Sequence, residues 1–592
     1  MGLDMWIFAT KFLPPKSFIR MSIENIMTEL PDADPQLAFL TMCALLGHKI
    51  NGTIEMGGNN FLKTTLYVGV VGPSGSGKSS TISLALSRLG LRALGTRTSA
   101  EGLARVLAEK PEEGVIHFAD EVHQMLSNVS GYLADVIDVW KTLYNRTDYI
   151  LERRNVANSI VVPGNAKLTV FWTTTEEDLE TVLNNVSSAW IRRSFVVPVS
   201  KSVSFFKPSR QASWNVVRGM YEAVGEIKFR FVIDDEDGEL YRLENEMKKK
   251  MLPYVNCPST EIGEKAVRLA TILAVDQLLA TALHRVEKEY RTDLLGVNEI
   301  KERVKDAILS IARGEGLTPF EYSFTYSENV TNGTNEKQTQ QNTDILYDER
   351  ETRNFNSSFN NSFNTHSTPP STLLQHTRDS RMREPPLYPL KEGVRAWCFT
   401  RVVEGVLKKV LNNLLKKVLN ELLKFDSYSN EESIINRVLI GDVFRITTNP
   451  QVISQALTLV AIAHSICARE PPSVRYDGRE GVVIVNIPPS LVKTAILVVL
   501  ANLMSSLRIK GWLGYDPEWG YFLRRLYELA DKNDGVVTLR KMCMYMKRLG
   551  KIETIKSYLM RAIYAGIIEP ENEEDLNMIR STTPLRVKYP GE

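Results

Sequence analysis

Three observations predict a mixed α/β fold built around a parallel sheet. The apolar run 65–71 enters a glycine-rich turn at residues 72–79, and the helical pattern "STISLALSRLG" follows it. Two later apolar runs, 115–119 and 167–175, also end in polar or acidic residues. Short buried runs that alternate with helical patterns are typical of parallel sheets. The composition, 43% hydrophobic and 24% charged over 592 residues, allows roughly three or four folded domains.

Charge, cysteine usage and hydropathy exclude several classes of protein. The balance of 72 Lys+Arg against 70 Asp+Glu gives only +2, so any attraction to nucleic acid would come from local patches. The five cysteines are scattered and never form a CxxC pair, which argues against a disulfide framework or a zinc site and favours a reducing compartment.

The N-terminal stretch lacks the features of a signal peptide. The longest apolar windows, 452–468 and 491–507, contain polar residues and are short for a membrane span of about 20 residues. We expect a cytoplasmic protein without membrane contact, in which these windows are buried helices.

Residues 1–60 are predicted to form a small helical lead-in. Its main element is the stretch "DADPQLAFLTMCALLGHKI", which we expect to be one amphipathic helix. The nucleotide-binding core should then begin at residue 61.

The glycine-rich turn predicts a phosphate-binding loop within a core at residues 61–230. Its glycines let backbone N–H groups wrap phosphates, and the following helix N-terminus adds partial positive charge. Lys78 would reach the β- and γ-phosphate oxygens, and the Ser79 hydroxyl would ligate Mg²⁺. The full eight-residue pattern therefore predicts ATP and Mg²⁺ as cofactors. The predicted nucleotide-binding residues are Gly72, Pro73, Ser74, Gly75, Ser76, Gly77, Lys78, Ser79 and Ser80.

The apolar run 115–119 ends in a pair of carboxylates, Asp120 and Glu121. We expect this run to lie beside the loop strand and to present both side chains at its carboxyl end, where open α/β sheets bind ligands. Asp120 would hold Mg²⁺ through water, and Glu121 would polarise the attacking water as a general base. The alternative is a surface acidic pair at a strand end.

Between the acidic pair and the next apolar run, the stretch "NRTDYILERRNVANSIVVPGNAKL" alternates like a β-hairpin. Its basic residues are Arg153, Arg154 and Lys167. A hairpin inserted here could reach into the central channel of a ring and hold a nucleic-acid backbone. A purely structural hairpin is the alternative.

Two further features suggest an ATPase that works in a ring. The run 167–175 ends in Thr173, Thr174 and Thr175, whose hydroxyls could sense the γ-phosphate, and Thr174 is the predicted sensor. Soon afterwards, "SSAWIRRSFVV" places Arg192 and Arg193 before a new apolar run. An arginine offered to the γ-phosphate of a neighbouring copy stabilises transition-state charge and contributes about 10³- to 10⁵-fold in rate. The alternative for the arginine pair is a solvated turn or a local salt bridge.

Residues 21–313 resemble the P-loop ATPases of unassigned function that plasmids, viruses and prophages carry, often joined to primase domains. Those ATPases are similar in turn to the minichromosome maintenance helicases of the AAA+ class. The stretches that carry the resemblance are "LYVGVVGPSGSGKSS", "TSAEGLARVL", "FADEVHQML", "LYNRTDYILERR" and "WIRRSFVVP".

The resemblance implies an AAA+-like ATPase core at 61–230 with a helical lid at 231–320. The turn "WIRRSFVV" resembles the arginine-finger turn of the minichromosome group. The stretch "EKAVRLATILA" resembles the lid, and its Arg268 would be the second sensor arginine that contacts the nucleotide. The sequence departs from that group in having threonine where sensor one is usually asparagine, and in lacking a recognisable zinc-bearing N-terminal domain.

The composition changes sharply after the core. Residues 321–390 are rich in Asn, Ser and Thr and poor in aliphatic residues, which predicts a disordered linker. Residues 391–519 are predicted to be a helical region of unnamed role. They begin with the repeat "VLKKVLNNLLKKVLNE", an amphipathic helix that could pack on neighbours, lie on a membrane surface or contact nucleic acid.

Residues 520–592 read as three helices followed by strands, which is the winged helix-turn-helix pattern. Thr538 caps the second of these helices. In such a fold the third helix enters the major groove, and Lys551, Lys556 and Arg561 are its candidate DNA contacts. Winged helices also mediate protein contacts, and this one carries the acidic stretch "EPENEED". Binding to a protein is therefore the alternative to binding DNA.

Together these features predict an ATP-dependent DNA motor, a helicase or translocase of a mobile element. It would assemble as a homo-oligomer, a hexamer, and act on single-stranded or forked DNA with other replication proteins. One alternative is an origin-binding initiator or helicase loader that uses ATP as an assembly switch. The other is a DNA-binding regulatory or defence scaffold whose ATP site controls its oligomeric state.

Overall fold

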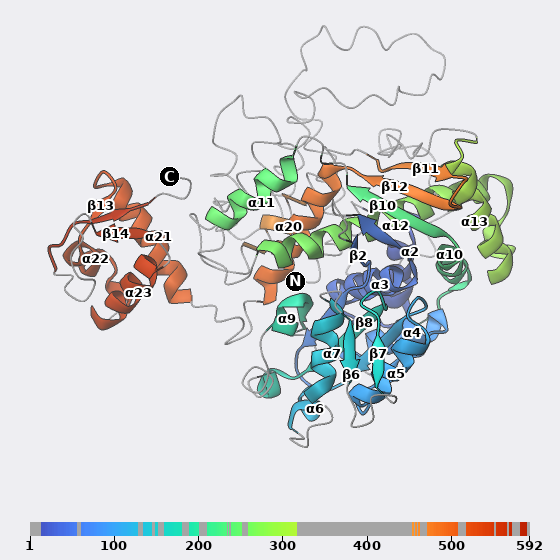
Figure 1. Ribbon diagram of the computed structural model, residues 1–592, viewed down its shortest axis with the longest axis horizontal. Helices are drawn as coiled ribbons and strands as arrows, with labels where there is room; N and C mark the ends of the chain where they lie inside the picture. Colours follow the sequence, from blue (N-terminus) through green and yellow to red (C-terminus); the bar gives the residue numbers. More distant parts are fainter. Residues whose placement is uncertain are drawn as a thin grey trace, which may run out of the picture.

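The protein has a mixed α/β architecture that includes an all-parallel five-stranded sheet (Figure 1). The computed structural model describes residues 13–55, 61–127, 134–144, 148–151, 159–179, 189–199, 210–233, 235, 238–250, 259–315, 453–454, 456–458, 460–461, 471–506, 517–549, 552–564, 567–570 and 581–588. The predicted linker at 321–390 and the lysine-rich repeat that follows it lie outside these residues.

The first sheet has the strand order β4-β5-β8-β3-β9, and every neighbouring pair in it is parallel. The loop strand β3 is buried along its length, as expected of a central strand in a parallel sheet. Its neighbours are β8 and β9. Strand β5 lies beyond β8, and the short β4 forms the far edge. The bounds are β3 (Tyr67–Val71), β4 (Leu94–Gly95), β5 (Val115–Ala119), β8 (Leu168–Thr174) and β9 (Ser194–Pro198).

The position of β5 differs from the prediction. Its run was expected beside the loop strand, but β8 lies between the two and pairs with both. Crossover connections let a strand that comes later in the chain insert between two earlier ones. The prediction was therefore wrong about adjacency, whereas the placement of Asp120 and Glu121 just after the carboxyl end of β5 is confirmed.

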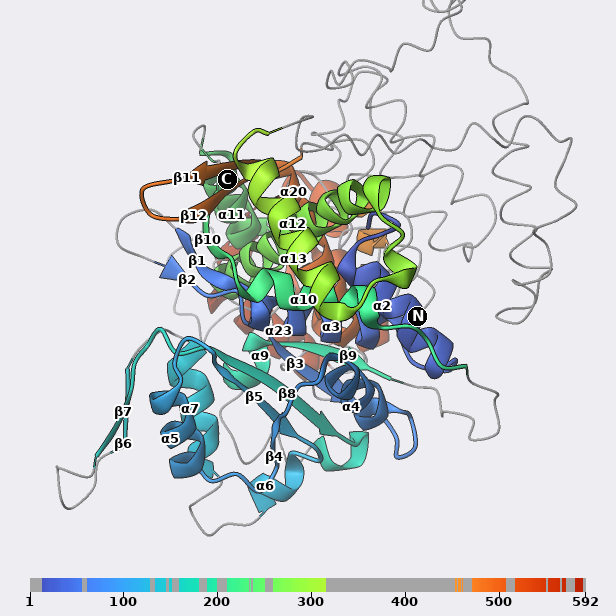
Figure 2. The same cartoon turned by 90° about the vertical axis from the view of Figure 1, so that its right-hand side faces the viewer.

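Helices pack on this sheet and connect its strands (Figure 2). Helix α4 (Lys78–Leu89) begins after Gly77, whose φ is 76°, and ends at Gly90, whose φ is 71°. Both angles fall in the left-handed region that glycine adopts at little cost. The other helices of this layer are α5 (Ala100–Glu109), α6 (His123–Ser127), α7 (Ala134–Tyr144) and α9 (Ala189–Arg193).

A second five-stranded sheet, in the order β11-β12-β10-β1-β2, joins distant parts of the chain. Strand β10 pairs in parallel with β1 on one side and with β12 on the other. Because β11 and β12 follow the predicted linker, the chain returns after it to complete a sheet begun before it. The bounds are β1 (Asn51–Glu55), β2 (Phe61–Leu62), β10 (Lys228–Ile233), β11 (Ser473–Asp477) and β12 (Val482–Ile487).

This return corrects the prediction for residues 391–519 in two respects. Residues 391–519 were expected to be helical, but they contain strands β11 and β12. They were also expected to be separate from the core, but helix α20 (Pro489–Ser506) packs against α12 (Ser259–Glu289) and against β9. Helices α12 and α20 are each long and apolar enough to cross a membrane, but both are mostly buried inside the protein, as core helices are.

Helix α12 also differs from the predicted lid. It packs with α20, with α13 (Val297–Ala312) and with α3 (Pro35–Lys49), so it is a core helix of the layer between the two sheets. Helix α3 is buried from Gln36 to His48, not on one face only as an amphipathic helix would be. Enclosure by α2, α12 and the first sheet explains this burial. The remaining helices here are α2 (Phe18–Glu29), α10 (Asn215–Gly225) and α11 (Glu239–Lys250).

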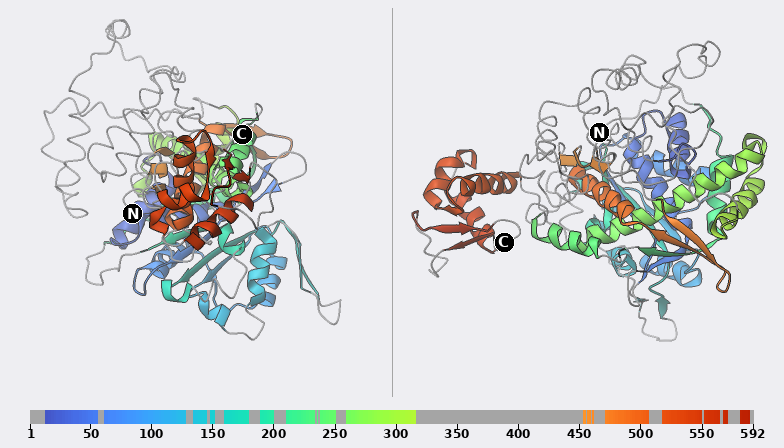
Figure 3. Two further views of the ribbon diagram at one scale, coloured as in Figure 1. Left: turned by 90° about the vertical axis from the view of Figure 1, so that its left-hand side faces the viewer. Right: turned by 90° about the horizontal axis from the view of Figure 1, so that it is seen from above.

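The C-terminal residues form a small body of three helices and a three-stranded antiparallel sheet in the order β13-β15-β14. Figure 1 and the right view of Figure 3 show it beside the rest of the chain. Thr538 caps α22 as predicted, because its side chain accepts a hydrogen bond from the Lys541 N–H. The elements are α21 (Pro517–Asp531), β13 (Val536–Val537), α22 (Leu539–Tyr545), η5 (Lys547–Leu549), α23 (Ile552–Tyr564), β14 (Ile568–Pro570) and β15 (Leu585–Val587).

Candidate active site

The glycine-rich loop lies between the carboxyl end of β3 and the N-terminus of α4. Gly75 and Gly77 have φ angles of 75° and 76°, so the loop needs residues that tolerate the left-handed region. Gly72 is required for a different reason, since a Cβ there would lie 2.2 Å from the Val199 carbonyl oxygen. The Gly72 N–H donates to the Thr174 carbonyl, at 3.2 Å, which ties the loop to β8.

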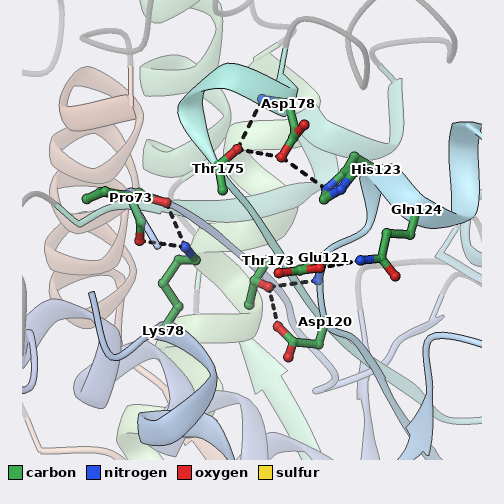
Figure 4. A network of polar contacts seen from close by, with 10 residues as sticks. Pro73, Lys78, Asp120, Glu121, His123, Gln124, Thr173, Thr175 and Asp178 are labelled. Atoms are coloured by element: carbon green, nitrogen blue, oxygen red, sulfur yellow. Dashed lines mark hydrogen bonds and ion pairs between the residues drawn. The ribbon is translucent and has the colours of Figure 1, made fainter. Parts of the chain in front are cut away.

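The Lys78 side chain bends back over the loop. Its Nζ donates to the carbonyl oxygens of Gly72, at 2.6 Å, and Pro73, at 2.9 Å (Figure 4). Burial lowers the pKa of Lys78, and the nearby Asp120 carboxylate opposes that shift. The ammonium is thus held at the inside of the loop, with two neutral acceptors that an anion could replace.

Asp120, which follows β5, contacts both the glycine-rich loop and strand β8. Its Oδ1 accepts a hydrogen bond from Thr173 Oγ1 at 2.6 Å (Figure 4). The same oxygen accepts a second hydrogen bond from Ser79 Oγ, also at 2.6 Å. The Asp120 carbonyl accepts from Thr96 Oγ1 at 2.7 Å, which fixes the strand end from the other side. Two separate stretches of sequence therefore meet at the Asp120 carboxylate, and a third contacts its backbone carbonyl.

Glu121 has an unusual backbone conformation. Its φ is 55°, in the left-handed region that a residue with a side chain enters at a cost of about 1–2 kcal/mol. The Glu121 N–H donates to Thr173 Oγ1 at 3.0 Å, and its carboxylate accepts from Gln124 Nε2. Strain of this kind at a non-glycine residue is often found at functional sites.

The three threonines at the end of β8 have different surroundings. Thr173 Oγ1 bonds Asp120, and Thr175 Oγ1 donates to Asp178 Oδ2 at 2.6 Å. Thr174 Oγ1 is buried and has no hydrogen-bond partner among the residues that the structure describes. Successive side chains of a strand point to opposite faces, so residues 173 and 175 share the face of the acidic pair and residue 174 does not. The predicted sensor, Thr174, therefore does not lie on the face of the acidic pair.

Asp178 and the bridging role of Thr173 were not found from the sequence. The Asp178 carboxylate also lies 3.4 Å from His123 Nδ1. The backbone N–H of Asp178 donates to Thr175 Oγ1 at 3.1 Å. The signal for Asp178 was present, because a threonine followed three residues later by an acidic residue is typical of a helix start. The signal for Thr173 was the alternation along the strand.

The predicted arginine pair lies away from this site. Arg192 and Arg193 end α9, directly before β9, and therefore lie at the amino edge of the parallel sheet. Arg192 Nε is 3.5 Å from a Glu261 carboxylate oxygen, and the Arg193 guanidinium lies 5.6 Å from the centre of the Tyr144 ring. Neither arginine can act on the loop of its own chain, which lies at the carboxyl edge.

Arg268 is a correction to the sequence prediction. It is only 2% exposed, its Nη1 donates to the Thr65 carbonyl at 2.9 Å, and its guanidinium packs 4.2 Å from the centre of the Tyr144 ring. Thr65 precedes β3, whereas the loop follows it, so Arg268 is enclosed at the opposite edge of the sheet from the loop. It therefore supports the core from the sheet edge opposite the loop of its own chain.

The predicted hairpin forms from β6 (Tyr149–Leu151) and β7 (Ile160–Val162), which pair antiparallel and extend from the sheet (Figure 2). Arg153 and Arg154 lie outside the described residues. Lys167 lies at the base of the hairpin, where its Nζ donates to the Ile50 carbonyl at 2.9 Å and burial lowers its pKa to about 8. It is therefore turned toward the core.

The predicted DNA contacts of the C-terminal body are only partly described. Lys551 and the side chain of Arg561 lie outside the described residues. Lys556 is exposed on α23.

Comparison with models of protein families finds no match for this chain, and no curated protein matches it.

Proposed function

We propose that this chain is an ATP-hydrolysing motor of the AAA+ type that moves on or unwinds DNA in the replication of a mobile element. The observation that supports it most is the shared oxygen Asp120 Oδ1, which Ser79 and Thr173 both contact. These contacts lie at the carboxyl edge of a parallel sheet, where such sheets bind ligands. A hydroxyl and a carboxylate that converge in this way are the oxygen ligands that Mg²⁺ prefers.

Each residue of the site then has a role that its surroundings suit. Ser79 and Asp120 would hold Mg²⁺, which would neutralise charge on the phosphates. Lys78 would exchange the loop carbonyls for phosphate oxygens. Glu121 would orient the attacking water and accept its proton, because a carboxylate at this edge can face the terminal phosphate. Thr173 would hold Asp120 and the backbone of Glu121 in register.

A ring is part of the proposal because of the arginine pair. Arg192 and Arg193 lie at the sheet edge opposite their own loop, so an arginine finger here would act on the loop of a neighbouring copy. Hydrolysis would then depend on assembly, and we propose a hexamer.

We also propose that the C-terminal body is a winged helix that binds DNA. Its three helices and the sheet order β13-β15-β14 support this reading, because a hairpin packed after the third helix is what that fold requires. The body would keep the motor on its DNA track.

The change Glu121→Gln tests the proposal. It preserves size and removes the proton acceptor, so ATP hydrolysis should fall by about 10²- to 10⁴-fold while nucleotide binding persists. The measurement is phosphate release with single-stranded, forked and duplex DNA, over a range of protein concentrations. For the wild type, the rate per chain should rise with protein concentration, because the site is completed between copies.

Glu113→Gln is the matched control, since Glu113 is an exposed glutamate paired with Lys110 on a nearby turn. It should hydrolyse ATP like the wild type. If Glu121→Gln releases phosphate as fast as Glu113→Gln in the presence of DNA, the motor proposal fails. Hydrolysis without strand displacement on forked DNA would instead favour the initiator or loader.

A further inference from the structure

An unusual concentration of positive charge lies on α21 and η5 of the C-terminal body. The guanidinium groups of Arg524, Arg525 and Arg548 lie 5.7, 5.6 and 5.4 Å from the centre of a single ring, that of Tyr521. Arg524 and Arg525 belong to α21, and Arg548 belongs to the short turn η5 that follows α22. We call these three residues, with the neighbouring exposed Lys547, the arginine cluster.

The cluster carries more positive charge than its surroundings neutralise. In the described part of the chain, Glu528 is the one carboxylate that ion-pairs with it, through Arg525 Nη1 at 2.5 Å. The attraction of each guanidinium to the ring face contributes about 0.5–1 kcal/mol at an exposed site, which does not cancel repulsion among three like charges. An anionic ligand would relieve that repulsion, and arginine matches phosphate oxygens with a planar pair of donors.

The described side chains of the third helix carry no net charge, although Arg561 belongs to the same helix. Among the side chains of α23 that the structure describes, the charged ones are Glu553 and Lys556, which cancel. Because the whole chain carries only +2, a local excess of this kind is where nucleic acid would be attracted.

The neighbourhood favours nucleic acid over an acidic protein. Tyr545 and Met544, at the end of α22, are 52% and 53% exposed, within four residues of Arg548. Lys532 Nζ lies 5.9 Å from the centre of the Tyr545 ring, so that ring also has a cation beside it. Exposed aromatic rings among cations are typical of surfaces that track a nucleic-acid backbone and stack its bases.

We infer that the arginine cluster on α21 and η5 is the principal contact of the C-terminal body with the DNA sugar–phosphate backbone. This inference rests on the proposal that the body binds DNA, and it assigns the binding surface. Contacts to phosphates do not depend on sequence, so this surface would hold the motor on DNA without selecting a site. Lys556 on α23 would contribute less.

The test uses the full chain without nucleotide, so its outcome does not depend on whether the loop hydrolyses ATP. Fluorescence anisotropy measures the affinity for a labelled single strand and for its duplex over a series of salt concentrations. The double change Lys547→Ala and Arg548→Ala removes two exposed cations. It should weaken binding to both DNAs by about tenfold or more and reduce the slope of log K against log salt by about 1.5–2.

Two further variants make the result specific. Arg548→Lys keeps the charge and loses the planar pair of donors, so it should weaken binding while leaving the salt slope near that of the wild type. Lys556→Ala is the matched control on α23 and should change the affinity by less than the double variant. Thermal unfolding of each variant should match the wild type, because Lys547 and Arg548 are exposed.

Three outcomes would overturn the inference. The double variant could bind DNA with the affinity and salt slope of the wild type, or Lys556→Ala could cause the larger loss, which would place the contact on α23. Alternatively, the wild type could bind polyglutamate and not DNA, with the same sensitivity to the double change, which would make the cluster a site for acidic proteins.

Discussion

Thr173 connects the parts of the candidate site through one hydroxyl group. Its Oγ1 donates to Asp120 Oδ1 at 2.6 Å and accepts from the Glu121 N–H at 3.0 Å. The second contact stabilises a backbone conformation that Glu121 would otherwise avoid, with φ at 55°. A strand neighbouring both the loop and the acidic pair thus positions the carboxylates on which the proposed chemistry depends.

The neighbouring threonines allow a matched test. Thr173→Val removes both hydrogen bonds at nearly constant volume, so ATP hydrolysis should fall about tenfold or more, because each lost contact with a charged or strained group is worth about 1–3 kcal/mol. Thr174→Val removes a buried hydroxyl that has no partner in the described part of the chain, so hydrolysis should persist and the melting temperature should stay equal or rise.

The measurement is phosphate release together with thermal unfolding for both variants. Equal losses of activity in the two would show that the bridge from Thr173 does not matter. A loss confined to Thr174→Val would restore residue 174 as the sensor.

At the scale of elements, α20 completes an edge of the first sheet. Strand β9 is the last strand of that sheet, and an unpaired edge presents free N–H and C=O groups. Asn502 on α20 satisfies both groups of Val196, since its Oδ1 accepts from the N–H at 3.2 Å and its Nδ2 donates to the carbonyl at 2.9 Å. Because β9 directly follows the arginine pair, α20 also supports the strand that carries the proposed finger.

Asn502→Ala should therefore be costly. It leaves two buried backbone groups unpaired, which should lower the free energy of unfolding by about 2–4 kcal/mol. Ser506→Ala is the control on the same helix, because its hydroxyl donates to the Leu503 carbonyl within that helix. Urea unfolding of the full chain measures both, and similar midpoints for the two variants would contradict the role given to Asn502.

At the scale of the whole molecule, the core is built from two stretches separated by the predicted linker. Strand β12 pairs with β10, and α20 packs on α12. A chain that ended before the linker would leave the β10 edge open and an apolar face of α12 exposed, and both conditions favour aggregation.

A split chain tests this organisation. Residues 1–320 produced alone should be insoluble or should unfold at a much lower temperature than the full chain. Residues 451–592 produced in the same cells should restore a soluble complex that elutes as one species from a sizing column. A soluble fragment 1–320 that melts like the full chain would show that the returning segment is dispensable.

Much of the candidate site could be predicted because its signals are local. The glycines of the loop, Lys78 and Ser79 lie within eight residues, and Asp120 and Glu121 follow one apolar run. Positive φ at Gly75 and Gly77 is a property of glycine itself, so the loop conformation needs little from the rest of the chain. The Thr538 cap of α22 was predictable for the same reason.

The sequence by itself determined the loop, the acidic pair and the strands that carry them, because turn chemistry, capping and alternation act within a few residues. Only the tertiary structure decided that β8 separates β5 from β3, that Thr173 is the bridge, that Arg268 is enclosed at the far edge of the sheet, and that residues 473–506 belong to the core. Those outcomes depend on contacts between distant residues, such as Asn502 and Val196, which are 306 positions apart. The pattern of residues within one stretch does not indicate which distant segment covers a strand edge or a helix face.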